Sequence, residues 1–269
     1  MRDPRLPDNQ LRGRVGSRTV YEEELSFTNR VADRAADIAM SYFRSRFDVK
    51  IKPDMTPVTE ADLAVEEMFR KEVSVVFPSD VVVGEEHGIA EGDRRWVIDP
   101  IDGTKNFTDG VPIWGTLIAL QIGGRGVLGV ASAPAMGERY VAVRGGGATC
   151  NGERISVRSR PLDHSFLIYS SVESWFDDRR NAFEALVRAT RRNRGFGDFW
   201  GHMLVARGAA DIMAEPELRI WDWAAAEVIV EEAGGRMTTF EGEPLGDGSS
   251  VLTTSAAVHD QVLRVLSGP

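Results

Sequence analysis

Residues 96–107 read Trp-Val-Ile-Asp-Pro-Ile-Asp-Gly-Thr-Lys-Asn-Phe, and every other part of the sequence is interpreted outward from this stretch. The apolar run Trp96–Ile98 is bounded by polar segments and predicts a short buried strand. Asp99 and Asp102 follow directly, so we expect two carboxylates on one tight turn at the mouth of that strand. Pro100 lacks an N–H group and stiffens this turn.

The two residues that follow suit a bound phosphate. Gly103 allows close approach of the backbone, because it carries no Cβ atom. Thr104 can begin a helix whose free N–H groups face an anion. The stretch therefore predicts paired carboxylates beside a phosphate-binding helix start.

Further acidic segments stand where other predicted strands end. They are Gly84-Glu85-Glu86, Glu215 and Trp221-Asp222. Crowded carboxylates repel one another and raise their pKa values, and hard divalent cations such as Mg²⁺, which prefer oxygen ligands, remove that penalty. Taken singly, Asp-Pro and Asp-Gly pairs suit ordinary turns, and a Glu-Glu pair suits a solvated surface. Their combination and order favour a metal site.

Hydrophobic periodicity predicts the elements around these segments. Helical spacing begins at Glu22, and a second helix is expected from Thr59 to a point before Pro78. Val81–Val83 predicts a second buried strand, and residues 114–142 predict successive antiparallel strands. In the remainder we expect helices near residues 178–190, 199–207, 223–233 and 258–266, and strands near Ile168, Ile212 and Val251.

These elements divide the chain into three expected parts. Residues 1–19 are rich in Arg, Pro and Gly and are expected to form a mobile N-terminal extension. Residues 20–155 are expected to form an α+β half that carries most of the metal ligands. Residues 156–269 are expected to form an α/β half that carries Asp222 and the substrate-selecting residues.

Composition and charge restrict the possible functions. The 269 residues are 42% hydrophobic and 27% charged, which is typical of a soluble globular enzyme. The net charge of −9 argues against nonspecific nucleic-acid or anionic-membrane binding, which needs a basic face. Neither a membrane-spanning apolar run nor a signal peptide is found in the sequence, so we expect a cytoplasmic protein. Cys150 is the single cysteine, which excludes an intramolecular disulfide and a thiolate metal cluster.

Three blocks of sequence resemble the signature blocks of the inositol monophosphatase family. They are Gly84-Glu-Glu86, the stretch of residues 96–107, and Trp221-Asp-Trp-Ala-Ala225. The resemblance runs from about Glu24 to the C-terminus. It implies a mixed α+β and α/β fold, a layered α-β-α-β-α sandwich of the inositol monophosphatase and fructose-1,6-bisphosphatase type. Ala226 departs from the family pattern, which usually has Gly there.

The resemblance implies a Mg²⁺-dependent phosphomonoesterase in which metal-activated water attacks the ester. It assigns Glu85, Asp99 and the backbone carbonyl of Ile101 to a first Mg²⁺ and Asp99, Asp102 and Asp222 to a second, with two or three ions expected per site. All of these residues except Asp99 are also expected to line the substrate. A homodimer is expected from the same resemblance.

The resemblance also implies roles for groups around the metal ions. The N–H groups of Gly103 and Thr104 are expected to face the phosphate. Asp62 is expected to orient the Thr104 hydroxyl, which together with Glu85 positions the nucleophilic water. The segment Thr59-Glu-Ala-Asp62 fits a helix-capping box equally well, and both roles can hold at once.

Substrate choice depends on residues outside the metal site. The segment Gly197-Asp198-Phe199-Trp200 resembles the histidinol-phosphate phosphatase branch of the family, whereas inositol monophosphatases usually have Gly-Ser-Ala-Ala there. Asp198 and Glu215 can accept hydrogen bonds from the ammonium and imidazole groups of histidinol phosphate. Arg194 can contact the phosphate or steady a carboxylate. The plainer interpretation makes Asp198 a helix cap, and we expect Phe199 and Trp200 to be core residues.

The expected reaction is therefore hydrolysis of L-histidinol phosphate to L-histidinol and phosphate. An inositol-1-phosphate phosphatase or a broader sugar monophosphatase is the alternative among enzymes. A regulatory binding protein on the same fold is the alternative outside enzymes, and the complete set of carboxylates argues against it.

Overall fold

The computed structural model describes residues 21–43, 49–51, 57–176 and 179–268, and the expected extension of residues 1–19 lies outside this part. The described residues form two large β-sheets, of seven and five strands, and a small two-stranded sheet. The larger sheet has the order β3-β4-β5-β6-β7-β8-β9, with β3 parallel to β4 and the remaining neighbours antiparallel. Its strands are β3 (Val81–Gly84), β4 (Arg94–Asp102), β5 (Gly115–Ile122), β6 (Arg125–Ala133), β7 (Glu138–Val143), β8 (Gly147–Cys150) and β9 (Glu153–Arg154).

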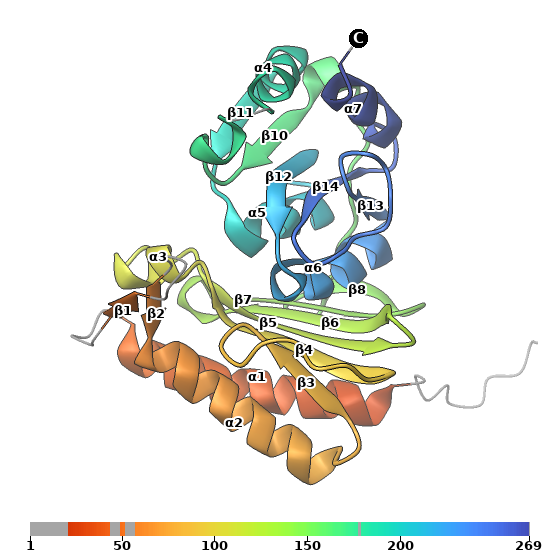
Figure 1. Cartoon of the computed structure of the whole chain (residues 1–269). Helices are drawn as coiled ribbons and strands as arrows, with labels where there is room; N and C mark the ends of the chain where they lie inside the picture. The colour runs from red at the N-terminus through yellow and green to blue at the C-terminus, as the bar shows by residue number, and fades with distance from the viewer. Residues whose placement is uncertain (1–20, 44–48, 52–56, 177–178, 269) are drawn as a thin grey trace, which may run out of the picture.

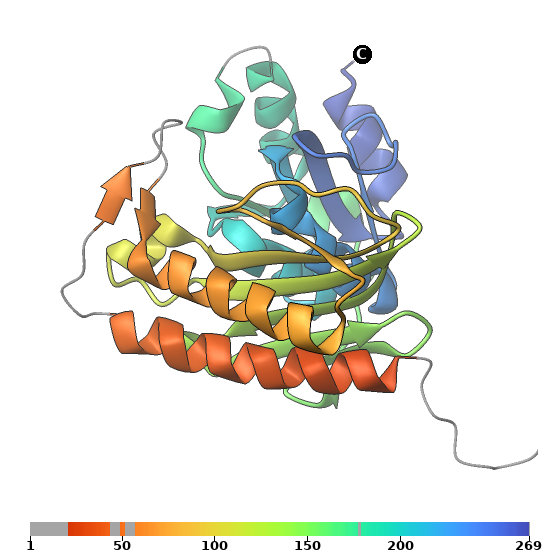
Figure 2. The same ribbon diagram turned by 60° about the horizontal axis from the view of Figure 1, so that its bottom comes forward.

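Two long helices cover the outer face of this sheet. They are α1 (Glu22–Tyr42) and α2 (Glu60–Val76), which lie side by side across the strands (Figure 2). Phe27 of α1 and Phe69 of α2 pack around Trp96 of β4, with the ring centroids of Phe27 and Trp96 5.2 Å apart. The two helices predicted from periodicity and the strands predicted at Val81–Val83 and Trp96–Ile98 are thus confirmed. A small hairpin of β1 (Val49–Ile51) and β2 (Pro57–Thr59) precedes α2.

The smaller sheet has the order β11-β10-β12-β14-β13, with β10 parallel to β11 and β12 and the other neighbours antiparallel. Its strands are β10 (Phe166–Tyr169), β11 (Arg192–Gly195), β12 (Ile212–Leu218), β13 (Gly235–Thr238) and β14 (Ser249–Ser255). Helices α4 (Arg180–Ala189) and α7 (His259–Leu266) cover its outer face. Short β11 and β13 lacked a hydrophobic signal strong enough to be predicted, since β11 reads Arg-Asn-Arg-Gly.

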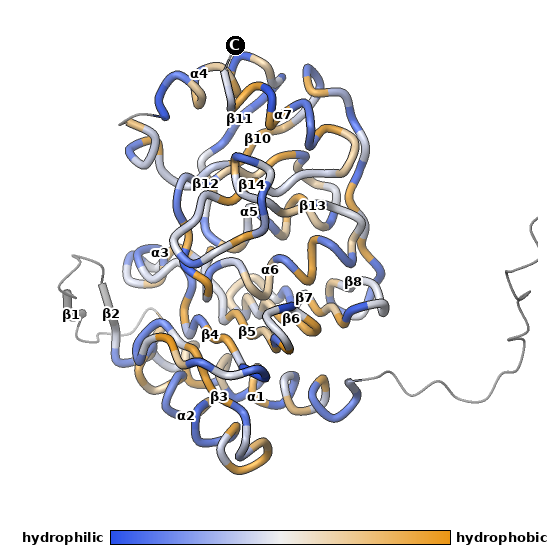
Figure 3. The backbone as a smooth tube through the Cα atoms, turned by 45° about the vertical axis from the view of Figure 1, so that its right-hand side comes forward, coloured by the Kyte–Doolittle hydropathy of each residue, from blue (hydrophilic) through white to orange (hydrophobic). Residues whose placement is uncertain are grey.

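Helices α5 (Asp198–Ala206) and α6 (Ile220–Glu232) lie between the two sheets (Figure 1). Eight of the 13 side chains of α6 are buried, as expected of a helix packed between two sheets, and its tube in Figure 3 mixes pale and orange stretches with blue ones. Close packing on β6 requires a glycine: a Cβ atom on Gly129 would lie 2.4 Å from the Ala225 carbonyl oxygen. Ala226, where the family usually has Gly, is fully buried in the same core.

The predicted α-β-α-β-α sandwich is confirmed by this succession of layers (Figure 1). The connection from β9 to β10 joins the two sheets, and the predicted division between residues 155 and 156 falls in it. Every helix in the described part of the chain is too short or too polar to span a bilayer.

Candidate active site

Asp99 and Asp102 lie at a bulge near the end of β4. Asp99 pairs with Leu117 and Asp102 with Gly115, so three steps along β4 face two steps along β5. The tight turn expected after Ile98 is therefore wrong: the strand continues to Asp102. Pro100 cannot donate to a ladder, which suits a bulge, and its carbonyl accepts a hydrogen bond of 2.8 Å from the Thr116 hydroxyl.

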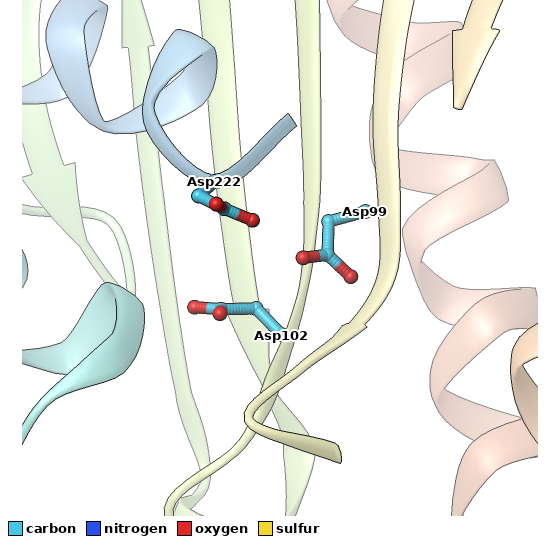
Figure 4. Close-up of side chains that lie close together, drawn as sticks. All are labelled: Asp99, Asp102 and Asp222. Atoms are coloured by element: carbon cyan, nitrogen blue, oxygen red, sulfur yellow. The ribbon is translucent and has the colours of Figure 1, made fainter. Parts of the chain in front are cut away.

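The first turn of α6 brings a third carboxylate to the bulge. Asp222 is the third residue of α6, and its Oδ2 accepts a 2.7 Å hydrogen bond from the Arg219 N–H. Asp99, Asp102 and Asp222 each offer a carboxylate oxygen within 4.8 Å of the others. Figure 4 shows the three side chains converging from β4 and α6. The structure thus joins residues 120 positions apart in one acidic cluster.

Burial and mutual repulsion make this cluster unfavourable without a cation. Burial raises the pKa of Asp99 well above its ordinary value, and the carboxylates of Glu85 and Asp102 raise it further. The pKa of Asp102 is raised in the same way, by burial and then by Asp198 and Asp222. Burial raises the pKa of Asp222 to about 7. Asp99 is 2% exposed, and its Oδ1 has no hydrogen-bond partner among the described residues.

This donor set fits Mg²⁺. Its side chains offer only oxygen atoms, the buried Asp99 oxygen lacks a partner, and a cation would relieve the repulsion that raises the three pKa values. Glu85, in the loop after β3, lines the same cavity but lies outside the mutually close group of three aspartates.

The cluster lines a small cavity of about 180 Å³. Its lining residues come from the loop after β3, the β4–α3 segment, α5 and α6, where α3 is Thr104–Thr108: Glu85, Asp99, Ile101, Asp102, Gly103, Thr104, Lys105, Asp198 and Asp222. Asp222 also lines a neighbouring cleft of about 620 Å³, together with Glu173, Arg179, Glu217 and Arg219. A small cavity thus adjoins a larger cleft, and Asp222 lines both.

Thr104 is the first residue of α3, as predicted, and follows Gly103 in the left-handed conformation with φ 86°. Its hydroxyl donates a 3.0 Å hydrogen bond to the Ile101 carbonyl. Asp62 instead closes the capping box at Thr59, whose N–H and hydroxyl both donate to Asp62 Oδ2. In this structure the Thr104 hydroxyl bonds to Ile101, and the expected role of Asp62 in orienting that hydroxyl stays a prediction.

Asp62 has a second carboxylate oxygen that takes no part in the capping box. Its Oδ1 is buried and has no hydrogen-bond partner within the described ranges. Burial raises its pKa to about 7, with further contributions from Glu86 and Glu85. The capping role is confirmed, and a catalytic role stays a prediction.

Asp198 reaches the cavity from the second half of the chain. Its Oδ2 accepts a 2.9 Å hydrogen bond from the Asn106 side-chain amide. Gly197 is the N-cap of α5, so the plainer interpretation of Asp198 as a helix cap is wrong. Asp198 has a positive φ of 50°, an unfavourable conformation for a non-glycine residue, and burial raises its pKa to about 6.

The neighbours of Asp198 are structural. Phe199 is 1% exposed within the core between the sheets, and its backbone N–H donates to Asp102 Oδ2. Trp200 packs against the same core and is half-buried. The expectation of a core residue is confirmed for Phe199, whereas Trp200 packs at the edge of the core and stays partly exposed.

Glu215 and Arg194 lie outside the lining of the small cavity. Glu215, on β12, is 3% exposed; Ser170 donates to its Oε2, and burial raises its pKa to about 8. Arg194, on the edge strand β11, is exposed and donates a 2.8 Å hydrogen bond to the Asn193 carbonyl. Arg194 therefore contacts a backbone carbonyl here, and its expected role beside the phosphate or a carboxylate stays a prediction.

Two residues of the site were missed in the sequence. Lys105 lines the cavity and lowers the pKa of Asp198, although burial outweighs this effect. Asn106 holds Asp198 and also donates a 2.9 Å hydrogen bond to the Ile113 carbonyl. Both directly follow Thr104, so their position at the start of α3 was the available signal.

Comparison with known proteins agrees with this geometry. Residues 21–267 match the inositol monophosphatase family. The chain belongs to this family. It is a phosphoric monoester hydrolase, and the cluster of three aspartates fits the family's dependence on metal.

Three relatives of this family member are informative. A histidinol-phosphatase of Streptomyces coelicolor is 44% identical over 262 residues, covering 92% of this chain and 98% of the relative. A histidinol-phosphatase of Mycobacterium tuberculosis is 42% identical, covering 91% and 98%. The structure of an inositol monophosphatase from Zymomonas mobilis has a TM-score of 0.85 and 34% identity, covering 93% of this chain and all of that one.

Proposed function

We propose that this phosphatase hydrolyses L-histidinol phosphate to L-histidinol and phosphate. The observation that carries the proposal is the half-buried Asp198 carboxylate, which lines the cavity and is held there by Asn106. Histidinol carries an ammonium group and an imidazole that titrates near neutral pH, so a carboxylate beside the alcohol portion favours this substrate. The names of the Streptomyces and Mycobacterium relatives support the same substrate.

The proposed cofactor is Mg²⁺, with two or three ions per site. Asp99, Asp102 and Asp222 would hold these ions together with Glu85 and the carbonyl of Ile101. When bound, Mg²⁺ polarises the phosphoryl group and lowers the pKa of water. The unpartnered Oδ1 of Asp99 and the shared repulsion of the carboxylates support this ligand set.

The protein groups bind and orient the substrate in this proposal. The backbone N–H groups of Gly103 and Thr104 bind phosphate oxygens, and the Lys105 ammonium adds attraction for the anion. Glu85 and the Thr104 hydroxyl orient the attacking water, and Asp62 supports this arrangement through its unpartnered oxygen. Asp198 accepts hydrogen bonds from the cationic half of the substrate, for which the larger cleft beside Asp222 offers room. Glu215 is the second proposed acceptor, although it is buried on β12 and lies outside the lining of both cavities.

Hydrolysis of inositol 1-phosphate or another sugar phosphate is the second candidate. Its support is the similarity to the inositol monophosphatase of Zymomonas mobilis. The cluster of three aspartates would act on the phosphate group, which all of these substrates share. A regulatory binding role is disfavoured, because the expected carboxylates are all present. The cytoplasmic location and the homodimer stay predictions.

The decisive experiment compares kcat/KM for histidinol phosphate, inositol 1-phosphate and fructose 1,6-bisphosphate on one preparation, with Mg²⁺ and with EDTA. We expect histidinol phosphate to be preferred and every rate to require the metal. A preference for inositol 1-phosphate would overturn the proposed substrate and leave the phosphatase assignment in place. Phosphate release that is equal in EDTA would overturn the metal-dependent mechanism.

A further inference from the structure

Glu66 of α2 is a buried carboxylate that lies outside the acidic cluster. Its side chain is 0% exposed, and three hydrogen-bonding groups contact its carboxylate. Oε1 accepts a 2.7 Å hydrogen bond from Arg70 Nε and lies 2.9 Å from His87 Nδ1. Oε2 accepts a 2.8 Å hydrogen bond from the backbone N–H of Glu86. A buried ion pair of this kind stabilises one specific arrangement, because either partner left alone would be costly.

The Glu66 carboxylate packs inside the turn that follows β3. A Cβ atom on Gly84 would lie only 2.3 Å from Glu66 Oε1, so the backbone can come this close only as glycine. Gly84 and Gly88 exchange two backbone hydrogen bonds, of 3.2 and 2.8 Å, which close the turn. Arg70 also donates a 3.1 Å hydrogen bond to the Val82 carbonyl within β3. Glu66 therefore contacts the turn itself, and Arg70 contacts the strand that leads into it.

Glu85 lies in the middle of this turn. It lines the small cavity and is close enough to Asp99 to raise the pKa of that carboxylate. Repulsion from the aspartates favours movement of Glu85 away from the cavity, and a fixed backbone opposes this movement. The contacts of Glu66 with the sequence neighbours of Glu85 fix the backbone in this way.

We propose that Glu66 is a positioning residue that holds the turn of residues 84–88 so that Glu85 faces the acidic cluster. This inference rests on the proposed role of Glu85 as a metal ligand. Outer contacts of this kind orient the groups that bind a metal, and their loss typically weakens metal binding by about 10- to 100-fold.

The test uses Glu66→Gln in the full chain. The amide keeps the size of the side chain but loses its charge and one acceptor. Titration with Mn²⁺, followed by electron paramagnetic resonance, is expected to show binding about 10-fold weaker or more. Hydrogen exchange of the amides of residues 84–88 in EDTA is expected to be faster than in the wild type. Glu72→Gln is the matched control, because Glu72 lies on the same helix and pairs with Arg34, away from the turn.

A double-mutant cycle separates positioning from general stability. If Glu66 acts through Glu85, Glu66→Gln will add almost nothing to the loss of Mn²⁺ affinity in Glu85→Gln. Equal effects of Glu66→Gln in both backgrounds would overturn the inference, as would wild-type Mn²⁺ affinity or wild-type exchange in the single variant. Wild-type affinity in Glu85→Gln would instead overturn the proposed ligand role, and the inference with it.

A second variant approaches the same contact from the turn. Gly84→Ala places a methyl group against the Glu66 carboxylate and is expected to weaken Mn²⁺ binding as Glu66→Gln does. If Glu66→Gln does not fold, the Mn²⁺ affinity of Gly84→Ala becomes the test of the inference. Unchanged Mn²⁺ affinity in Gly84→Ala would then overturn the inference.

Discussion

The acidic cluster and the two carboxylates proposed to select the substrate, Asp198 and Glu215, differ in how their charges are compensated. Burial raises the pKa of Asp99, repulsion from neighbouring carboxylates raises it further, and its Oδ1 has no hydrogen-bond partner in the described part of the chain. Asp198 and Glu215 each accept a hydrogen bond from another side chain, although Glu215 Oε1 also lacks a partner there. The crowded carboxylates of the cluster therefore fit the proposed cation, whereas the two proposed selecting carboxylates are already held by hydrogen bonds, which would lower the entropic cost of binding a substrate.

This difference predicts that substitutions in the acidic cluster cause the largest loss of activity. We expect Asp99→Asn to lower kcat on the order of a thousandfold or more while the fold persists, because one anionic oxygen is lost where catalysis depends on charge and position. Steady-state kinetics at saturating Mg²⁺ and circular dichroism measure the two properties. Asp37→Asn, at an exposed position on α1, is the control and should leave kcat unchanged. Wild-type turnover in Asp99→Asn would show that the acidic cluster is not the active site.

Asp198→Ala should have a smaller and selective effect. A hydrogen bond to a charged group contributes roughly 1.5–3 kcal/mol, so we expect about a 10- to 100-fold loss of kcat/KM for histidinol phosphate. Hydrolysis of inositol 1-phosphate should change little. Asn106→Ala keeps the carboxylate but removes its hydrogen-bond donor, so a smaller loss with the same selectivity is expected. Equal losses for both substrates would show that Asp198 serves the fold.

The pH dependence of stability distinguishes the two regions without any substrate. The pKa of Asp222 rises from 3.8 to about 7 and that of Glu215 from 4.5 to about 8, both mainly through burial. For each group, at pH values between its ordinary pKa and its raised pKa, the folded state binds more protons than the unfolded state. The free energy of unfolding therefore falls as pH rises through this range. In EDTA we expect Tm to fall by several degrees between pH 5 and pH 8.

Excess Mg²⁺ should flatten that dependence, because a cation stabilises the ionised carboxylates of the folded state. Glu215→Gln should remove part of the remaining slope above pH 7, since Glu215 lies outside the cluster of three aspartates. A Tm in EDTA that rises with pH over this range would contradict the raised pKa values. Thermal unfolding followed by circular dichroism in matched buffers provides the measurement.

The same contrast explains what could be predicted from the sequence. Asp99 and Asp102 stand in one contiguous segment after a clear apolar strand, so local pattern was enough to propose them. Partner contacts depend on side chains far apart in the chain, such as Asn106 with Asp198, 92 positions away. The bulge in β4 was also missed, because its register is set by pairing with β5 and not by residues 99–102 alone. Local sequence therefore predicted the chemical groups better than their hydrogen bonds.

Arg194 should show the smallest effect. Its side chain is exposed on an edge strand and donates to the carbonyl of its neighbour, while Lys105 lines the cavity. Surface substitutions usually change free energies by less than about 0.5 kcal/mol, so Arg194→Ala should keep kcat/KM within about twofold of the wild type. Lys105→Met should raise KM severalfold, because it removes a cation beside the expected phosphate position. The opposite result would be a large loss of kcat/KM in Arg194→Ala and an unchanged KM in Lys105→Met. It would mean that β11 moves toward the phosphate during the reaction and that Arg194 belongs to the phosphate site.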